Sequence, residues 1–205
     1  MYHDMSMPSD IPGYGLMGNN VKEKLKFCGE KVRIYPWCKI VRPESAMLDN
    51  GCKIFDYVFI DAGAGLKIGK YSTLTWHVLI EGGARTEIGD RVFIGPGSKL
   101  LTGTFTLNGY YSLYTDEKEL DGCFKNMYGD IILEDDAYIG ANCSIFPGSI
   151  IHEGAVVGAN SFVKGELEPW TVYVGSPCRA IAKRELPTEE RRQKLMEAID
   201  WSNHL

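Results

Sequence analysis

The chain has 205 residues, of which 44% are hydrophobic and 24% are charged. This composition fits a single soluble domain, because no apolar stretch approaches the ~20 residues that a membrane-spanning helix needs. The formal net charge of −5 disfavours nucleic acid and anionic membrane surfaces as partners. The first residues, MYHDMSMPSD, lack the basic start and the apolar core of a secretory signal, so we expect a cytoplasmic protein.

Residues 1–29 are predicted to form an irregular N-terminal segment, because prolines and glycines interrupt any regular pattern there. A short polar helical turn is expected near residues 21–26. We expect the whole segment to pack on the beginning of the domain or on a neighbouring subunit.

An aliphatic side chain at every sixth position dominates the long central part of the chain. The residues in this pattern are Leu48, Ile54, Ile60, Ile68, Leu74, Ile80, Ile88, Ile94, Leu100, Leu133, Ile139, Ile145, Ile151, Val157 and Val163. Small residues follow several of them, as in Ile68-Gly69 and Ile139-Gly140, which suits short strands joined by tight corners. Three such sides make one triangular coil, so the sequence predicts a solenoid of stacked coils over residues 30–184.

Two interruptions of the repeat are candidate functional segments. Eight residues instead of six separate Ile80 from Ile88, which predicts an outward bulge at a corner near Glu81. Residues 101–130 lose the period altogether and carry several tyrosines. A segment of this length without a core of its own favours a functional loop, although a plain contact between subunits remains the alternative.

The C-terminal residues 185–205 are predicted to form an amphipathic helix with Thr188 as its N-cap. We expect this helix to cover the open end of the solenoid, which would otherwise expose an unpaired sheet edge. Basic residues gather just before and within it, and they suggest an anionic ligand. These residues are Arg179, Lys183, Arg184, Arg191, Arg192 and Lys194.

The cysteines and histidines do not form a recognisable metal site. The six cysteines lie far apart, with no Cys-x-x-Cys pair, and are expected to be buried thiols that need no metal. Of the four histidines, His3 and His204 lie near the chain ends, and His152 occupies an outward repeat position. His77 lies just before the predicted bulge and is the candidate for a cleft, with a structural role beside Trp76 as the alternative.

Two stretches of the repeat region resemble the hexapeptide-repeat acyltransferases. They are IGANCSIFPGSIIHEGAVVGANSFVK, residues 139–164, and the closing run VYVGSPCRAIAKR, residues 172–184. The resemblance covers roughly residues 30–184 and extends to sugar O-acetyltransferases and nucleotide-sugar N-acyltransferases. It implies an all-β fold, a left-handed parallel β-helix with an extruded loop at 101–130 and a C-terminal helix, and it implies a homotrimer.

The resemblance also implies coenzyme A, or a similar thioester, in the groove between adjacent solenoids. Small corner residues would leave backbone groups open to the narrow pantetheine arm; these are Gly140, Ala141, Gly158 and Ala159. Lys164 and Arg179 are the expected partners of its phosphates. Pro177 matches the loop on which the adenine rests in this family.

The acceptor is predicted to be a small sugar that carries an amine. O-Acetyltransferases of this family use a histidine in a Thr-Gly-x-His-like stretch, whereas the corresponding residues 101–106 contain none. An amine with a pKa near ~8 is partly unprotonated at neutral pH and needs no strong base. We therefore predict transfer of a short acyl group to an amino sugar. The resemblance implies that this sugar is nucleotide-linked and used for surface polysaccharide. His77 or Glu81 would accept the proton or orient the amine. The three loop tyrosines would stack on a base or sugar ring; they are Tyr110, Tyr111 and Tyr114.

Three alternatives remain open from the sequence. The first is a sugar O-acetyltransferase whose base is His77 or comes from a neighbouring chain. The second is a γ-type carbonic anhydrase, a class that uses three histidines to hold zinc between subunits, for which residues 94–133 offer no suitable set. The third is a non-catalytic solenoid that serves as an assembly subunit.

Overall fold

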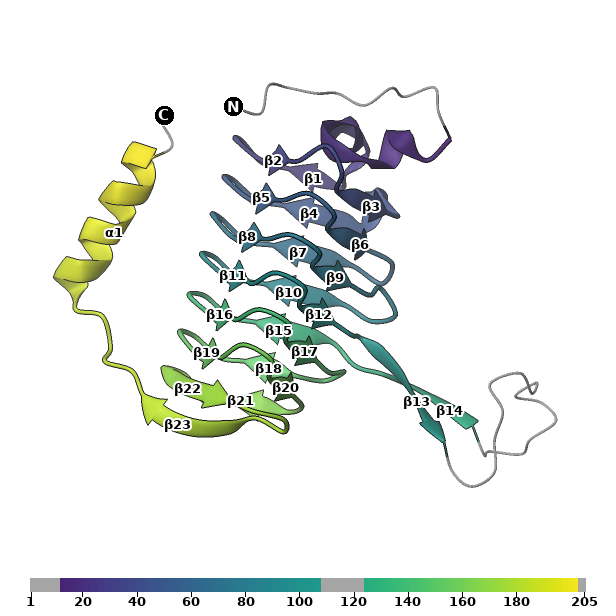
Figure 1. Ribbon diagram of the computed structural model, residues 1–205. Coiled ribbons are helices and arrows are strands. Elements are labelled where there is room, and N and C mark those ends of the chain that lie inside the picture. Colours follow the sequence, from purple (N-terminus) through teal and green to yellow (C-terminus); the bar gives the residue numbers. More distant parts are fainter. Residues whose placement is uncertain (1–11, 108–123, 203–205) are drawn as a thin grey trace.

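Short strands stack into three parallel sheets that form the sides of a triangular solenoid (Figure 1). The computed structural model describes residues 12–107 and 124–202. The first sheet contains β1 (Phe27–Cys28), β4 (Ala46–Leu48), β7 (Leu66–Ile68), β10 (Thr86–Ile88), β15 (Ile131–Leu133), β18 (Ile150–Ile151) and β21 (Glu166–Leu167). The second contains β2 (Arg33–Ile34), β5 (Lys53–Ile54), β8 (Thr73–Leu74), β11 (Phe93–Ile94), β16 (Tyr138–Ile139), β19 (Val156–Val157), β22 (Thr171–Val174) and β23 (Arg179–Lys183). The third contains β3 (Lys39–Val41), β6 (Phe59–Asp61), β9 (Leu79–Ile80), β12 (Lys99–Leu100), β17 (Ser144–Ile145) and β20 (Phe162–Val163).

Each coil takes one strand from each sheet in turn, so the strands from β1 to β12 and from β15 to β20 make six complete coils within the described residues. The strands β21 and β22 begin a seventh. We call the corner between the first and second sheets corner 1, the corner between the second and third sheets corner 2, and the corner that returns to the first sheet corner 3. The predicted fold class, an all-β left-handed parallel β-helix with an extruded loop and a C-terminal helix, is confirmed.

The sixth-position aliphatic residues form the core, as the sequence predicts. On the second sheet, Ile54 pairs with Leu74, and Leu74 pairs with Ile94, so identical positions of successive coils stack directly on one another. All fifteen predicted aliphatics are at most 1% exposed. This continuous burial holds the coils together, because one coil cannot bury its own aliphatic residues without a neighbour.

The corners are turned by residues with left-handed backbone conformation. His77, Asn142 and Asn160 occupy the same position of corner 2 in three different coils, with φ of 60°, 55° and 57°. Asparagine tolerates this conformation better than most residues, whereas other side chains adopt it at a cost of about 1–2 kcal/mol. Backbone bonds between neighbouring coils offset that cost, as where the Asn160 N–H donates to the Ala141 oxygen at 2.8 Å.

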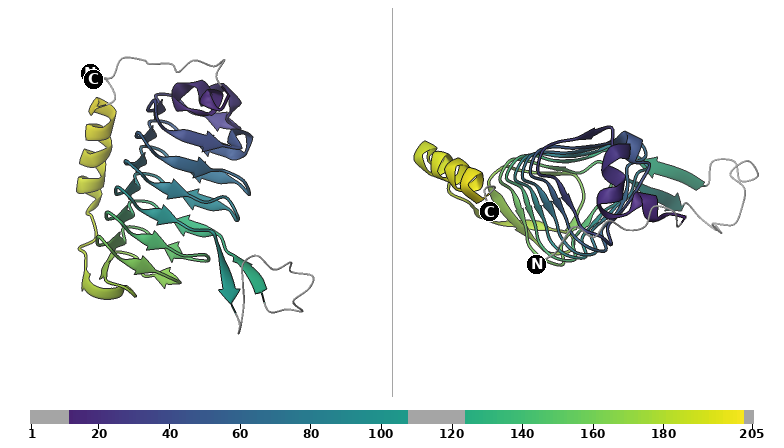
Figure 2. Two further views of the ribbon diagram at one scale, coloured as in Figure 1. Left: turned by 45° about the vertical axis from the view of Figure 1, so that its right-hand side comes forward. Right: turned by 90° about the horizontal axis from the view of Figure 1, so that it is seen from above.

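The segment predicted to leave the repeat does so as an antiparallel hairpin. Its strands are β13 (Gly103–Leu107) and β14 (Phe124–Tyr128), and they project from corner 3 beyond the stacked coils (Figures 1 and 2). Short 3-10 helices stand at the start of the chain and at one corner: η1 (Tyr14–Leu16), η2 (Gly18–Lys24) and η3 (Pro43–Ser45). The helical turn predicted near residues 21–26 corresponds to the end of η2.

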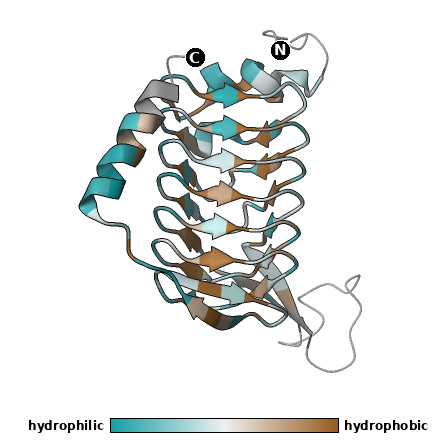
Figure 3. Ribbon diagram, turned by 60° about the vertical axis from the view of Figure 1, so that its left-hand side comes forward, coloured by the Kyte–Doolittle hydropathy of each residue, from teal (hydrophilic) through white to brown (hydrophobic). Residues whose placement is uncertain are grey.

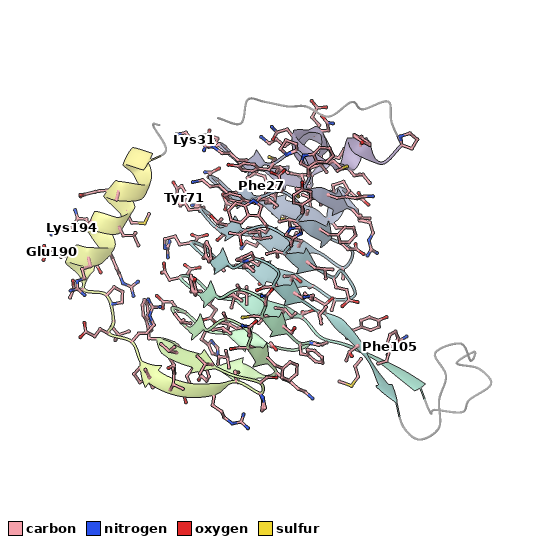
Figure 4. The ribbon with its side chains drawn as sticks, viewed as in Figure 1. Phe27, Lys31, Tyr71, Phe105, Glu190 and Lys194 are labelled. Carbon is pink, nitrogen blue, oxygen red and sulfur yellow. The ribbon has the colours of Figure 1, made fainter. Side chains whose placement is uncertain are left out.

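The C-terminal helix forms where predicted but does not cover the end of the solenoid. Helix α1 (Glu189–Ser202) begins directly after Thr188, whose Oγ1 accepts the Arg191 N–H at 3.3 Å. The helix lies beside the coils at corner 1 and is mostly hydrophilic (Figures 1 and 3). The Glu190–Lys194 ion pair, at 2.7 Å, points away from the coils (Figure 4).

The expected end cap is wrong because β23 pairs antiparallel with β22 and covers the last edge of the second sheet itself. The chain then continues past corner 1 and up the side of the solenoid. Within the described residues, no helix has the length and apolar character needed to cross a membrane.

Candidate functional site

Small residues occupy corner 2 in the later coils. The fifth coil has Gly140 and Ala141 there, and the sixth has Gly158 and Ala159; we call these four residues the small-residue column. A Cβ on Gly140 would lie 2.6 Å from the Ala159 backbone nitrogen, so the two coils approach too closely for a side chain at this position. The four residues that the sequence predicts for the cofactor arm therefore line one edge of the solenoid.

His77 belongs to the same corner, two coils before the small-residue column. In the intervening coil, the Gly97 N–H donates to the Trp76 oxygen at 3.0 Å. The imidazole of His77 is exposed and stacks on Tyr57, with ring centroids 5.1 Å apart and planes at 7°. The stacking partner is thus Tyr57 of the preceding coil, while Trp76 is 46% exposed at the neighbouring corner position.

The first three coils carry aromatic side chains at corner 2, which the sequence analysis missed. Trp37 and Tyr57 are 44% and 56% exposed, and Tyr35 stacks on Phe55 with centroids 4.7 Å apart. With Trp76, these residues form what we call the aromatic part of corner 2. A spacing of twenty residues, seen at Trp37, Tyr57 and His77, was the signal that could have located them.

Glu81 lies at a different corner from His77. The two residues stand at opposite ends of strand β9, so Glu81 belongs to corner 3. One carboxylate oxygen, Oε2, accepts the backbone N–H of Gly103 at 3.0 Å, at the first residue of the hairpin. Within one chain, the structure does not bring the two predicted catalytic residues together.

The residues predicted for the phosphates and the adenine are divided between two corners. Pro177 lies at corner 2 of the last coil, and the adjoining Cys178 N–H donates to the Phe162 oxygen at 2.9 Å. Arg179 begins β23 beside it, exposed, with one guanidinium N–H on the Cys178 oxygen at 3.0 Å. Lys164 is exposed at the far end of β20, at corner 3. Pro177 and Arg179 continue the small-residue column, whereas Lys164 does not.

The C-terminal basic residues other than Arg179 are engaged elsewhere. Lys183 donates to Glu168 at 2.5 Å and lowers the pKa of that carboxyl. Arg184 donates to the Gly154 oxygen and lies 5.3 Å from the centre of the Trp170 ring. These contacts fasten the C-terminal segment to corner 1, where a cleft of about 460 Å³ separates it from the coils. Among the described residues, these basic side chains thus lie at corner 1 and do not form a patch for an anionic ligand at corner 2.

Other predicted groups are not tested by this geometry. Tyr110, Tyr111 and Tyr114 lie outside the described residues. Phe105, 53% exposed, lies on the hairpin outside the stacked coils (Figure 4).

In the part of the chain that the structure describes, no three His, Cys, Asp or Glu side chains are grouped as ligands of a metal ion.

Sequence comparison identifies known relatives of this chain. The sequence profile described as the hexapeptide repeat of succinyl-transferase matches residues 130–164. A dTDP-4-amino-4,6-dideoxy-D-glucose acyltransferase of Escherichia coli is 29% identical over 175 residues, which is 84% of this chain and 85% of that protein. A probable macrolide acetyltransferase of Lysinibacillus sphaericus is 32% identical over 134 residues, which is 57% of this chain and 71% of that protein.

Solved structures agree with the sequence relatives. AntD, an N-acyltransferase from Bacillus cereus in complex with dTDP and 3-hydroxybutyryl-CoA, superposes with a TM-score of 0.76 and 25% identity, over 87% of this chain and 94% of that chain. The coverage includes most of the coils and is therefore not confined to one repeat. On the strength of these relatives and of its stacked hexapeptide coils, the chain belongs to the hexapeptide-repeat acyltransferases, as the sequence predicts.

Proposed function

We propose that the protein transfers a short acyl group from coenzyme A to the amine of a nucleotide-linked amino sugar. The predicted enzyme class and the predicted co-substrate, a coenzyme A thioester, are confirmed by relatives that are acyltransferases and carry such thioesters. The observation that carries the proposal is the division of corner 2 into two surfaces. One consists of small residues, the other of aromatic rings, and His77 lies between them.

The small-residue column suits the pantetheine arm for a physical reason. That arm is a narrow chain with two amide groups, and it binds best where backbone N–H and C=O groups are not hidden by side chains. At this edge Ala159 is exposed and Ala141 and Gly158 are half-buried, while Gly140 is buried beneath them. Arg179, exposed at the end of the column, is then available to a phosphate.

The aromatic part of corner 2 suits the acceptor side. Flat rings bind by stacking on aromatic side chains, each stack contributing roughly 1–3 kcal/mol where a base is involved. The exposed rings of Trp37, Tyr57 and Trp76 supply such surfaces, two to four coils before the start of the small-residue column. The E. coli relative acts on a dTDP-linked amino sugar, and AntD binds dTDP, which favours a nucleotide-linked acceptor here.

The proposed reaction needs modest help from side chains. The free amine attacks the thioester carbonyl, the tetrahedral intermediate expels the coenzyme A thiolate, and the proton lost by the amine ends on the departing sulfur. His77, exposed and stacked on Tyr57, is the proposed group that accepts this proton or orients the amine. Backbone N–H groups of corner 2 are the proposed donors to the oxyanion.

A homotrimer and a role in surface polysaccharide synthesis are further parts of the proposal. Exposed tryptophan and tyrosine side chains on one corner are typical of a surface that another molecule covers. In a trimer, Lys164 and the hairpin at corner 3 of one copy would approach corner 2 of the next. The sugar product would then be a building block for an extracellular glycan.

The test is an acylation assay with matched acceptors. Purified protein is mixed with acetyl-CoA or 3-hydroxybutyryl-CoA and with dTDP-4-amino-4,6-dideoxyglucose or its 4-hydroxy counterpart, and products are identified by mass spectrometry. We expect an amide product and at least ~100-fold slower reaction of the hydroxyl compound, because a neutral hydroxyl is a weak nucleophile without a strong base. Faster acylation of the hydroxyl compound would establish the O-acetyltransferase alternative. No coenzyme A binding in calorimetry would favour the non-catalytic solenoid.

A further inference from the structure

Two insertions meet at corner 3, in successive coils. The third coil has the five-residue turn Glu81–Arg85, two residues longer than the repeat requires. The fourth coil has the hairpin of β13 and β14. In the described residues, the turn lies directly against the base of the hairpin, and the contacts between them are specific.

Three hydrogen bonds join the turn to the first strand of the hairpin. The Glu81 carboxylate accepts the Gly103 N–H at 3.0 Å. The Thr102 hydroxyl donates to the Glu81 backbone oxygen at 2.7 Å, and its oxygen accepts the Ala84 N–H at 3.1 Å. Thr102 is 0% exposed, so breaking its two bonds would leave a buried hydroxyl group without a partner.

The second strand of the hairpin is held by the other end of the turn. The Arg85 backbone N–H and its Nε both donate to the Asp130 carboxylate, at 3.0 and 3.2 Å. The Tyr128 ring lies over Gly83, where an added Cβ would meet ring atoms at 2.7 Å. Both strands of the hairpin are therefore held at their base by contacts with the same five-residue turn.

We infer that Glu81 is a positioning residue, which fixes the β13–β14 hairpin on the solenoid, and is not the group that takes a proton from the acceptor. Its carboxylate is bonded to the hairpin, and it stands at the opposite end of β9 from His77. The inference rests on the proposed function only in that the hairpin borders the acceptor. The hydrogen bonds themselves do not depend on that function.

The variants E81Q and E81A separate the two roles. Glutamine keeps an oxygen that can accept the Gly103 N–H but cannot take up a proton at neutral pH, whereas alanine removes both capacities. We expect E81A to raise amide hydrogen exchange of the hairpin at least ~10-fold and to raise the KM for the acceptor. E81Q should keep both quantities within ~3-fold of the wild type, and coenzyme A affinity should be unchanged in both variants.

Thr102 provides an independent test from the other side of the contact. T102V removes the hydroxyl with little change of shape and should reproduce the E81A exchange pattern. T102S keeps a hydroxyl and should show the exchange of the wild type. E44A is the control, because Glu44 is exposed at the same corner two coils earlier. It should leave hairpin exchange and kinetics unchanged.

Two results would overturn the inference. One is unchanged hairpin exchange in E81A, which would mean that the carboxylate does not hold the hairpin. The other is an E81Q variant that shows normal hairpin exchange but is as inactive as E81A. That result would mean that Glu81 takes part in proton transfer. Hydrogen exchange is measured without substrate, so failure of the proposed function would leave this readout intact.

Discussion

A large side chain at Ala159 should block coenzyme A without disturbing the fold. Ala159 is exposed at the second position of corner 2 in the sixth coil, and its backbone nitrogen lies directly beside Gly140. An indole there would cover the edge that we assign to the pantetheine arm. Because the side chain points to solvent, A159W adds bulk outside the core.

A159W should have a large effect on coenzyme A affinity and a small effect on stability. We expect coenzyme A to bind at least ~100-fold more weakly, which corresponds to about 2.7 kcal/mol. An exposed substitution away from caps and buried contacts changes the free energy of unfolding by about 0.5 kcal/mol or less. The melting temperature should therefore stay within a few degrees of the wild type.

Calorimetric titration with coenzyme A measures the first effect, and a thermal melt measures the second. K70W is a matched control, since Lys70 is exposed at the equivalent position of corner 1 in the third coil. It adds the same side chain to the solenoid but should leave the affinity within ~3-fold. Unchanged coenzyme A binding by A159W, with a normal melt, would show that the cofactor arm does not follow corner 2.

Three more outcomes can be measured on the same protein. H77A should lower kcat by about 10²-fold or more if the imidazole handles the proton, with an unchanged melting temperature because His77 is exposed; equal kcat in a steady-state assay would remove it from the mechanism. G82A should lower the free energy of unfolding in urea by about 1–3 kcal/mol, since its Cβ would lie 2.6 Å from the Asp61 backbone oxygen, and a wild-type midpoint would contradict this packing. Burial raises the pKa of Cys52 to about 12, so iodoacetamide at pH 8 should label it, by peptide mass mapping, only after unfolding; native labelling would mean that its coil opens.

The fold could be predicted because one property, burial, repeats with an unusual period. Ile54, Leu74 and Ile94 are in register across three coils, and any shift of one residue would turn them toward solvent. The first coil was not included in the predicted pattern. Its aliphatic Ile40 is fully buried and stands eight positions before Leu48, the same interval that separates Ile60 from Ile68.

The position of the small residues at corner 2 could be predicted because they belong to the same repeat as the core. Gly140 and Gly158 each follow an inward aliphatic residue, so reading the core also located the edge of corner 2. Trp37 and Tyr57 follow a period of twenty, the length of one coil including its corners. That period is visible only once the coil boundaries are known, which explains why the aromatic part of corner 2 escaped the sequence analysis.

The contacts of Glu81 and the location of the C-terminal helix could not be predicted, because they depend on long-range contacts that no local pattern encodes. The length of the turn predicted a bulge. The hydrogen bond from the Gly103 N–H to Glu81 could not be predicted, because it depends on where the base of the hairpin lies. Similarly, Thr188 predicted where the helix starts in the sequence but not where the helix lies on the solenoid. The helix lies beside corner 1 because contacts at Trp170 and Glu153 draw the segment there.

The division of predicted residues between corners has a consequence for assembly. Hydrogen bonds between all neighbouring coils make the solenoid rigid, so corner 3 of one chain cannot bend toward its own corner 2. In the proposed binding mode, Lys164 can therefore contact coenzyme A bound beside Gly158 only when Lys164 comes from another copy. If the protein is a trimer as proposed, coenzyme A affinity should depend on assembly. K164A should weaken coenzyme A binding even though the small-residue column is unchanged. If an isolated monomer bound coenzyme A as tightly as the assembled protein, Lys164 would have no part in the site.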